Sequence, residues 1–205
     1  MYNKKLWKQM WHFIWNDDSI WSWLANIIIA FVLIKFIVYP SLGFLLQTSH
    51  PVVAVVSESM EHNKNFEGWW QRAGEWYVGN GIKKKDFERF PLKGGFNKGD
   101  IMVLKGKKPE NINAGDIIVF WSAKKDPIIH RVVRKWEDNQ VYYFQTKGDN
   151  YETNPVSIKS PFLDETRISE KQIVGSAVFR IPILGYIKIW FVDSINILKS
   201  LIQKG

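Results

Sequence analysis

Three short segments of this chain carry side chains with the chemistry for nucleophilic catalysis. An apolar run, VVAVV, ends in the tetrapeptide SESM, Ser57 to Met60; the segment IIHRVV contains His130; and the segment QTKGDN contains Asp149. A serine hydroxyl becomes a strong nucleophile when a base removes its proton and a third group orients that base. The chain has no cysteine, which excludes a thiolate nucleophile and a thiolate metal site.

Histidine is the natural candidate for the base. Of the four histidines, His12 precedes the most apolar segment of the chain, and His50 and His62 lie near its far end or in a polar loop. Only His130 lies within a predicted strand, and a neutral imidazole can accept a proton at neutral pH. Taken singly, a serine at a strand end indicates a turn and a strand histidine a structural side chain. A functional prediction therefore depends on the three segments occurring together in one chain.

A membrane helix precedes these segments. From Ile20 to Tyr39 only Ser22, Asn26 and Lys35 are polar, and the length suits one bilayer crossing. The apolar part is too long for a cleaved signal peptide, and no small-residue cleavage site follows it. We predict a transmembrane anchor over residues 20–46.

Flanking charges predict the orientation of this anchor. Lys4, Lys5 and Lys8 precede it, and after it no lysine or arginine occurs before Lys64. The positive-inside rule then makes residues 1–19 cytoplasmic and the rest of the chain extracytoplasmic. An inner aromatic belt would be formed by Trp7, Trp11, Trp15, Trp21 and Trp23.

The C-terminal segment, residues 183–205, also has a helical pattern. Apolar residues recur at helical spacing on one face: Leu184, Ile187, Phe191, Ile195, Leu198 and Ile202. This pattern favours an amphipathic helix in the membrane interface over a second span. The chain is thus predicted to be single-pass, with two passes as the alternative.

The middle of the chain, residues 47–182, has the pattern of an all-β domain. Short runs rich in Val, Ile and aromatics predict strands: VVAVV, IMVLK, IIVFW, IIHRVVR, VYYFQT and IVGSAVFR. Gly-Asp pairs separate several of them, as turns require. We expect a mainly β, compact sheet or barrel. Residues 63–97 interrupt the pattern with aromatic and basic residues, indicating a membrane-contacting insertion, a covering flap or a surface excursion whose aromatics pack onto the domain.

Charge and tryptophan content point to a membrane surface. The net charge is +8, but the basic residues are scattered and no nucleic-acid module is present, so nucleic acid is not an expected partner. The eleven tryptophans are typical of a protein at a membrane–water interface, where lipids are the expected partners.

In their order, these motifs resemble the signal peptidase I family, specifically its archaeal and endoplasmic-reticulum type. The resemblance covers nearly the whole chain and rests on the anchor, VVSESM, KGDIMVL, AGDIIVF, IIHRVV, QTKGDN and the closing VGSAVFRIPILGYI. It implies that Ser59 is the nucleophile, that Ser57 helps bind the oxyanion, and that His130 is the base where bacterial relatives use Lys. Glu58 departs from the family's usual Gly, so the turn must suit an L-residue.

The identity of the acid is left open by a second departure. Asp149 matches the first family aspartate after the base, but Pro155 stands where many relatives have a second Asp. Asp149 is the favoured acid and Asp164 is its alternative; the third option is a Ser-His dyad that works without an acid. A Gly-Asp turn remains the structural interpretation of Asp149.

The predicted function is a membrane-bound serine endopeptidase, without metal or cofactor, that cleaves signal peptides from exported pre-proteins after small residues. Secretion machinery is a further expected partner. The alternative is a catalytically silent, membrane-tethered β module that binds exported chains or partner subunits. A self-cleaving regulator is disfavoured, because it would normally pair Ser with Lys and lack an anchor.

Overall fold

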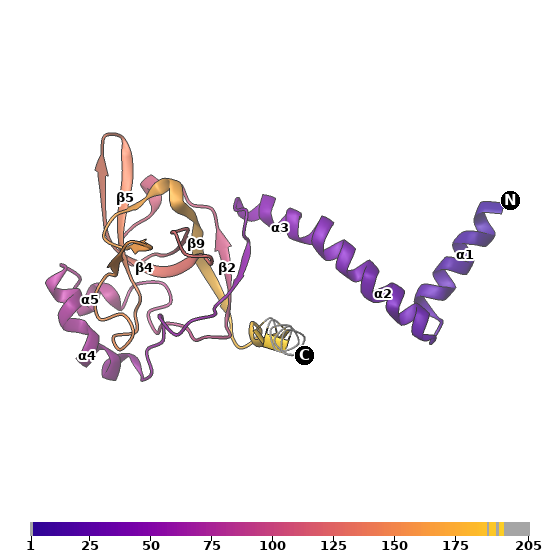
Figure 1. Ribbon diagram of the computed structural model, residues 1–205, viewed down its shortest axis with the longest axis horizontal. Helices are drawn as coiled ribbons and strands as arrows, with labels where there is room; N and C mark the ends of the chain where they lie inside the picture. Colours follow the sequence, from indigo (N-terminus) through magenta and orange to yellow (C-terminus); the bar gives the residue numbers. More distant parts are fainter. Residues whose placement is uncertain (1, 188, 192, 195–205) are drawn as a thin grey trace, which may run out of the picture. The chain divides into compact units, whose positions relative to one another are not determined.

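The computed structural model describes residues 2–187, 189–191 and 193–194, and the chain divides into two units, residues 1–45 and 46–205 (Figure 1). The predicted C-terminal helix, 183–205, lies largely outside the described residues and is not confirmed.

The first unit is helical. It contains α1 (Tyr2–Trp15), α2 (Ile20–Leu33), the π-helical segment η1 (Ile34–Val38) and all but the last residue of α3 (Tyr39–Leu46). From Ile20 to Leu46 the helix is continuous, and among the described residues it is the one helix long and apolar enough to cross a membrane. This confirms the predicted N-terminal apolar helix.

Two polar residues of this apolar helix find partners in α1. The Ser22 hydroxyl donates to the Phe13 carbonyl, and Asn26 Nδ2 donates to the Ile14 carbonyl at 2.9 Å. Carbonyls at the end of a helix lack intrahelical donors. The C-terminal end of α1 therefore satisfies the side chains that would otherwise be unpaired in an apolar segment.

The second unit is built on one curled, antiparallel sheet of seven strands in the order β1-β2-β9-β3-β4-β5-β8. Its strands are β1 (Val52–Ala54), β2 (Ile101–Lys105), β3 (Ile117–Phe120), β4 (Ile128–Asp138), β5 (Val141–Lys147), β8 (Ile168–Ser169) and β9 (Ile173–Ile181). A small hairpin pairs β6 (Lys159–Ser160) with β7 (Leu163–Asp164). The mainly β prediction is confirmed, and β1 lies at an edge of the sheet.

The central strand β3 is buried on both faces. Ile117 and Val119 pack in one apolar cluster with Met60 and Phe96, whereas Ile118 and Phe120 belong to a second. Register shifts in the β2–β9, β3–β9 and β4–β5 pairs mark irregularities of the kind that bend strands. The sheet therefore curls with apolar packing on both of its faces.

The insertion between β1 and β2 forms two helices, α4 (Phe66–Gly79) and α5 (Lys84–Phe87), beside the sheet (Figure 1). Trp69, Tyr77 and Phe87 are fully buried in a cluster that includes Val133 of β4. The aromatics of the insertion thus pack onto the domain, as expected if residues 63–97 are a surface excursion.

Lys147, at the end of β5, lies under this insertion. Its Nζ donates to the Gly148 carbonyl at 2.7 Å and lies 5.2 Å and 5.1 Å from the ring centroids of Trp76 and Tyr77. Burial lowers the Lys147 pKa from 10.5 to about 8, against the opposing pull of the Asp149 and Glu165 carboxylates.

This shift predicts a pH dependence of stability. Between the folded and unfolded pKa values of Lys147 the unfolded chain binds a proton that the folded chain does not, so stability rises with pH. The thermal midpoint of the full chain in detergent should rise between about pH 8 and 10.5 relative to Lys147→Met. Parallel curves for the two proteins would contradict the shift.

Candidate active site

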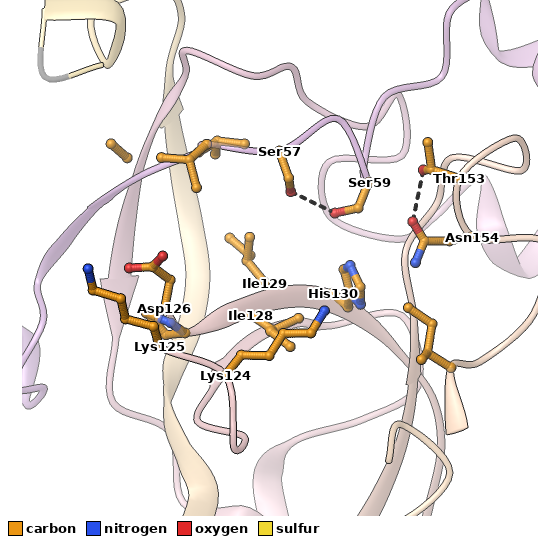
Figure 2. A pocket seen from close by; sticks show the side chains of 15 residues that line it. Ser57, Ser59, Lys124, Lys125, Asp126, Ile128, Ile129, His130, Thr153 and Asn154 are labelled. Atoms are coloured by element: carbon orange, nitrogen blue, oxygen red, sulfur yellow. Dashed lines mark hydrogen bonds between the residues drawn. The ribbon is translucent and has the colours of Figure 1, made fainter. Parts of the chain in front are cut away.

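The serine loop, Ser57 to Met60, begins three residues after Ala54, the last residue of β1. The Ser57 and Ser59 hydroxyl oxygens are 3.1 Å apart and hydrogen bonded (Figure 2). Met60 is 1% exposed and anchors the loop in the first apolar cluster. Glu58 is exposed and does not adopt a positive φ, which explains how this loop accommodates a residue other than glycine.

The segment after β5 holds the backbone of this loop. Asn150 donates its backbone N–H to the Ser59 carbonyl and its Nδ2 to the Glu58 carbonyl, each at 2.9 Å. A Cβ at Gly148 would lie 2.6 Å from the Ser59 carbonyl oxygen, so the approach requires glycine. The TKGDN motif is thus the support of the serine loop.

His130 lies near the start of β4 and faces the same pocket as Ser59. This pocket has a volume of about 360 Å³, and both residues line it. Figure 2 shows the His130 ring projecting toward Ser59. Among the described residues the Ser59 hydroxyl is paired with Ser57, and no hydrogen bond joins it to the imidazole.

The partner of the imidazole is Glu165. His130 Nδ1 lies 2.5 Å from Glu165 Oε1, and both side chains are buried. Glu165 Oε1 also accepts from the Thr146 hydroxyl, and Oε2 accepts from the Ile158 N–H, each at 2.9 Å. Burial raises the pKa of this carboxyl, but His130 and these donors outweigh burial and lower it. Glu165 is therefore a fixed, buried carboxylate.

Asp149 contacts the guanidinium of Arg131 and not the imidazole of His130. Its carboxylate accepts from Arg131 Nε at 3.0 and 3.1 Å, from Arg131 Nη2 at 2.6 Å and from the Tyr77 hydroxyl at 2.8 Å, while His62 Nε2 is 3.2 Å away. Burial alone would raise the Asp149 pKa, but the charge of Arg131 and the hydrogen bonds hold it well below its usual range. Successive side chains of a strand point to opposite faces, so Arg131 and His130 diverge.

Among the described residues, neither predicted acid is hydrogen bonded to His130. Asp149 contacts Arg131, and Asp164, the alternative, is exposed and accepts from the Thr166 N–H at 2.9 Å. Glu165, which sequence reasoning missed, contacts His130 instead. The signals in the sequence are Pro155, which leaves the identity of the acid open, and the position of Glu165 directly after the candidate Asp164.

One wall of the pocket is the free edge of β1 with the residues that follow it. The Val55 N–H donates to the Asp100 carbonyl at 2.8 Å, and the Val55 carbonyl accepts from the Gly99 N–H at 2.9 Å. Backbone groups of successive strand residues point to opposite sides. The backbone groups of Ala54 and Val56 are thus directed away from β2, and both residues line the pocket.

Comparison with known proteins identifies the family, although no family model matches the chain. The chain is 31% identical over 159 residues to the signal peptidase complex catalytic subunit sec11 of Schizosaccharomyces pombe, covering 76% of this chain and 74% of the relative. The chain belongs to the signal peptidase I family. The subunits named SEC11 in two Saccharomyces cerevisiae strains, YJM789 and RM11-1a, are 35% identical over 104 residues, which is 48% of this chain and 59% of theirs.

Within this signal peptidase, the buried Arg131–Asp149 pair predicts a large stability effect. Removing one partner of a buried pair leaves an uncompensated charge and costs about 3–5 kcal/mol. Asp149→Ala should lower the thermal midpoint of the full chain in detergent by roughly 10 °C.

The matched control is Asp138→Ala, which removes the exposed Asp138–Arg167 pair and should change the midpoint little. Equal midpoints for the two variants would contradict the assigned role of Asp149.

Proposed function

We propose that this chain is a membrane-bound serine endopeptidase that removes signal peptides from exported pre-proteins. Its relatives are named catalytic subunits of a signal peptidase complex, and family membership supports the same class of cleavage here. The observation that carries the proposal is one pocket lined by Ser59 and by an imidazole whose far nitrogen is bonded to a buried carboxylate.

The mechanism follows from the protonation state of His130 that its hydrogen bond to Glu165 requires. An ionised carboxylate only accepts hydrogen bonds, so Nδ1 of His130 carries the proton and Nε2 is the free base. Ser59 Oγ turns from Ser57 toward Nε2, loses its proton to it and attacks the scissile carbonyl carbon. His130 then gives that proton to the leaving amine, and a water hydrolyses the acyl-enzyme ester by the same base. Glu165 keeps the imidazole oriented and stabilises its cation.

Ser57 contributes to the oxyanion site. Its hydroxyl lies 3.1 Å from Ser59 Oγ, close enough to donate to an oxyanion formed at the attacked carbon together with the Ser59 backbone N–H. The hydrogen bond that Ser57 shares with Ser59 is exchanged for one to the oxyanion when Ser59 turns toward the base.

The substrate binds as an extended peptide along the edge of β1. The backbone groups of Ala54 and Val56 supply the donors and acceptors for an added strand. Small residues at the first and third positions before the cut are what the family resemblance implies, and the limited pocket volume of about 360 Å³ is consistent with them.

The anchor holds this chemistry at the membrane. We place residues 1–19 in the cytoplasm and the β domain on the extracytoplasmic side of the cell membrane. Pre-proteins are cleaved where their own apolar segment meets the bilayer, so anchoring enzyme and substrate in one membrane raises their effective concentration. Membrane lipids and secretion machinery are the remaining partners.

The first test is cleavage of a pre-protein in detergent micelles. Ser59→Ala and His130→Ala should abolish the cleavage, and Ser57→Ala should lower kcat by about 10²–10³ while KM changes little. Cleavage that survives Ser59→Ala would favour the alternative, a catalytically silent β module accompanied by a contaminating protease.

The second test separates two adjacent acids. Loss of the orienting carboxylate of a serine protease triad lowers kcat by about 10⁴, so Glu165→Gln should lower kcat to a similar degree. Asp164→Asn is the matched control and should cleave at the wild-type rate, because its side chain is exposed.

Glu165→Asp, which keeps the charge on a shorter side chain, should recover part of the lost rate. A loss of activity in Asp164→Asn with full activity in Glu165→Gln would overturn the assignment of the acid.

A further inference from the structure

The insertion of residues 63–97 contacts the segment that supports the nucleophile. The indole Nε1–H of Trp69, on α4, donates to the backbone carbonyl of Asp149 at 2.9 Å. From the same helix, the Tyr77 hydroxyl donates to Asp149 Oδ1 at 2.8 Å. All three residues are fully buried, so these bonds are shielded from water and their loss would leave polar groups unpaired.

The chain just after the serine loop also contacts α4, through His62. This histidine lies two residues beyond Met60 and is 3% exposed. Its ring stacks on Trp69 with the ring centroids 3.8 Å apart and the planes 3° apart. The chain that leaves the serine loop is therefore fixed against the same indole that bonds to Asp149.

Only short steps separate this contact from Ser59. The Asp149 N–H lies 3.3 Å from Met60 Sδ, and the next residue, Asn150, donates its N–H to the Ser59 carbonyl at 2.9 Å. One rigid helix thus touches both the segment that supports Ser59 and the chain that follows it. Errors of about 1 Å in the position of reacting groups cost up to about 10²-fold in rate.

We propose that α4 is a brace for the nucleophile and that Trp69 is a positioning residue for Ser59. Trp69 touches no reacting group and acts through Asp149 and His62. The inference rests on the proposed function for its kinetic consequence, whereas its structural consequence can be measured without cleavage.

The kinetic test compares Trp69→Phe with Trp70→Phe in the full chain in detergent. Trp69→Phe keeps an aromatic ring over His62 but removes the bond to the Asp149 carbonyl. It should lower kcat for a pre-protein about 10- to 100-fold with KM nearly unchanged. Trp70→Phe is the matched control, since Trp70 is the partly buried neighbour in the same cluster, and it should retain the wild-type kcat.

The second readout uses the absence of cysteine from the chain. Ser59→Cys introduces one thiol, whose pKa falls when it is held against an imidazolium, from an ordinary value of about 8.5. The pH profile of its alkylation by iodoacetamide then reports the position of the side chain. Combined with Trp69→Phe, the midpoint should move up toward about 8.5, and combined with Trp70→Phe it should stay unchanged.

The outcomes separate the two proposals. A wild-type chain that fails to cleave pre-proteins, together with an ordinary thiol in Ser59→Cys, would overturn the proposed function and the brace with it. Normal cleavage by wild type with equal kcat and equal alkylation midpoints in the two tryptophan variants would overturn the brace alone.

Discussion

The buried ion pair between Arg131 and Asp149 is the constraint on which the active-site region depends. Taking two charges out of water is costly unless every donor and acceptor is satisfied. The guanidinium meets this requirement by donating also to the carbonyls of Pro91, Leu92 and Gly115, at 2.9–3.0 Å. One side chain therefore joins the end of the insertion, the turn before β3 and the segment that supports Ser59.

Strand β4 divides the chemistry between its two faces. His130 and Arg131 are neighbours that point apart, and each receives its own buried carboxylate, Glu165 and Asp149. In the proposed mechanism the first pair orients the proton acceptor in the pocket. The second pair fixes the backbone that carries Ser59, the proposed nucleophile. Exchanging the two acids is not possible without turning β4 over, because alternation along a strand has a period of two.

Much of the fold was predictable because local patterns determine it. The apolar helix and the six main strands, β1 to β5 and β9, follow from hydropathy and β-branched residues. Motif order singles out Ser59 and His130, which line one pocket. Glu165 was not predictable. The neighbours Asp164 and Glu165 stand at the end of a two-residue strand, and which of them points inward depends on hairpin register and on contacts with Thr146 and Ile158. The carboxylate that pairs with His130 is therefore set by tertiary contacts and not by a local sequence pattern.

The most direct test of the pairing between His130 and Glu165 is the ring N–H proton resonance of His130. It is recorded on the full chain in detergent micelles, in protein labelled with ¹⁵N-histidine. A hydrogen bond to a carboxylate moves such a resonance strongly downfield. The account predicts a downfield His130 Nδ1–H signal in wild type and in Asp164→Asn, and its loss in Glu165→Gln. A signal that persists unchanged in Glu165→Gln would contradict it.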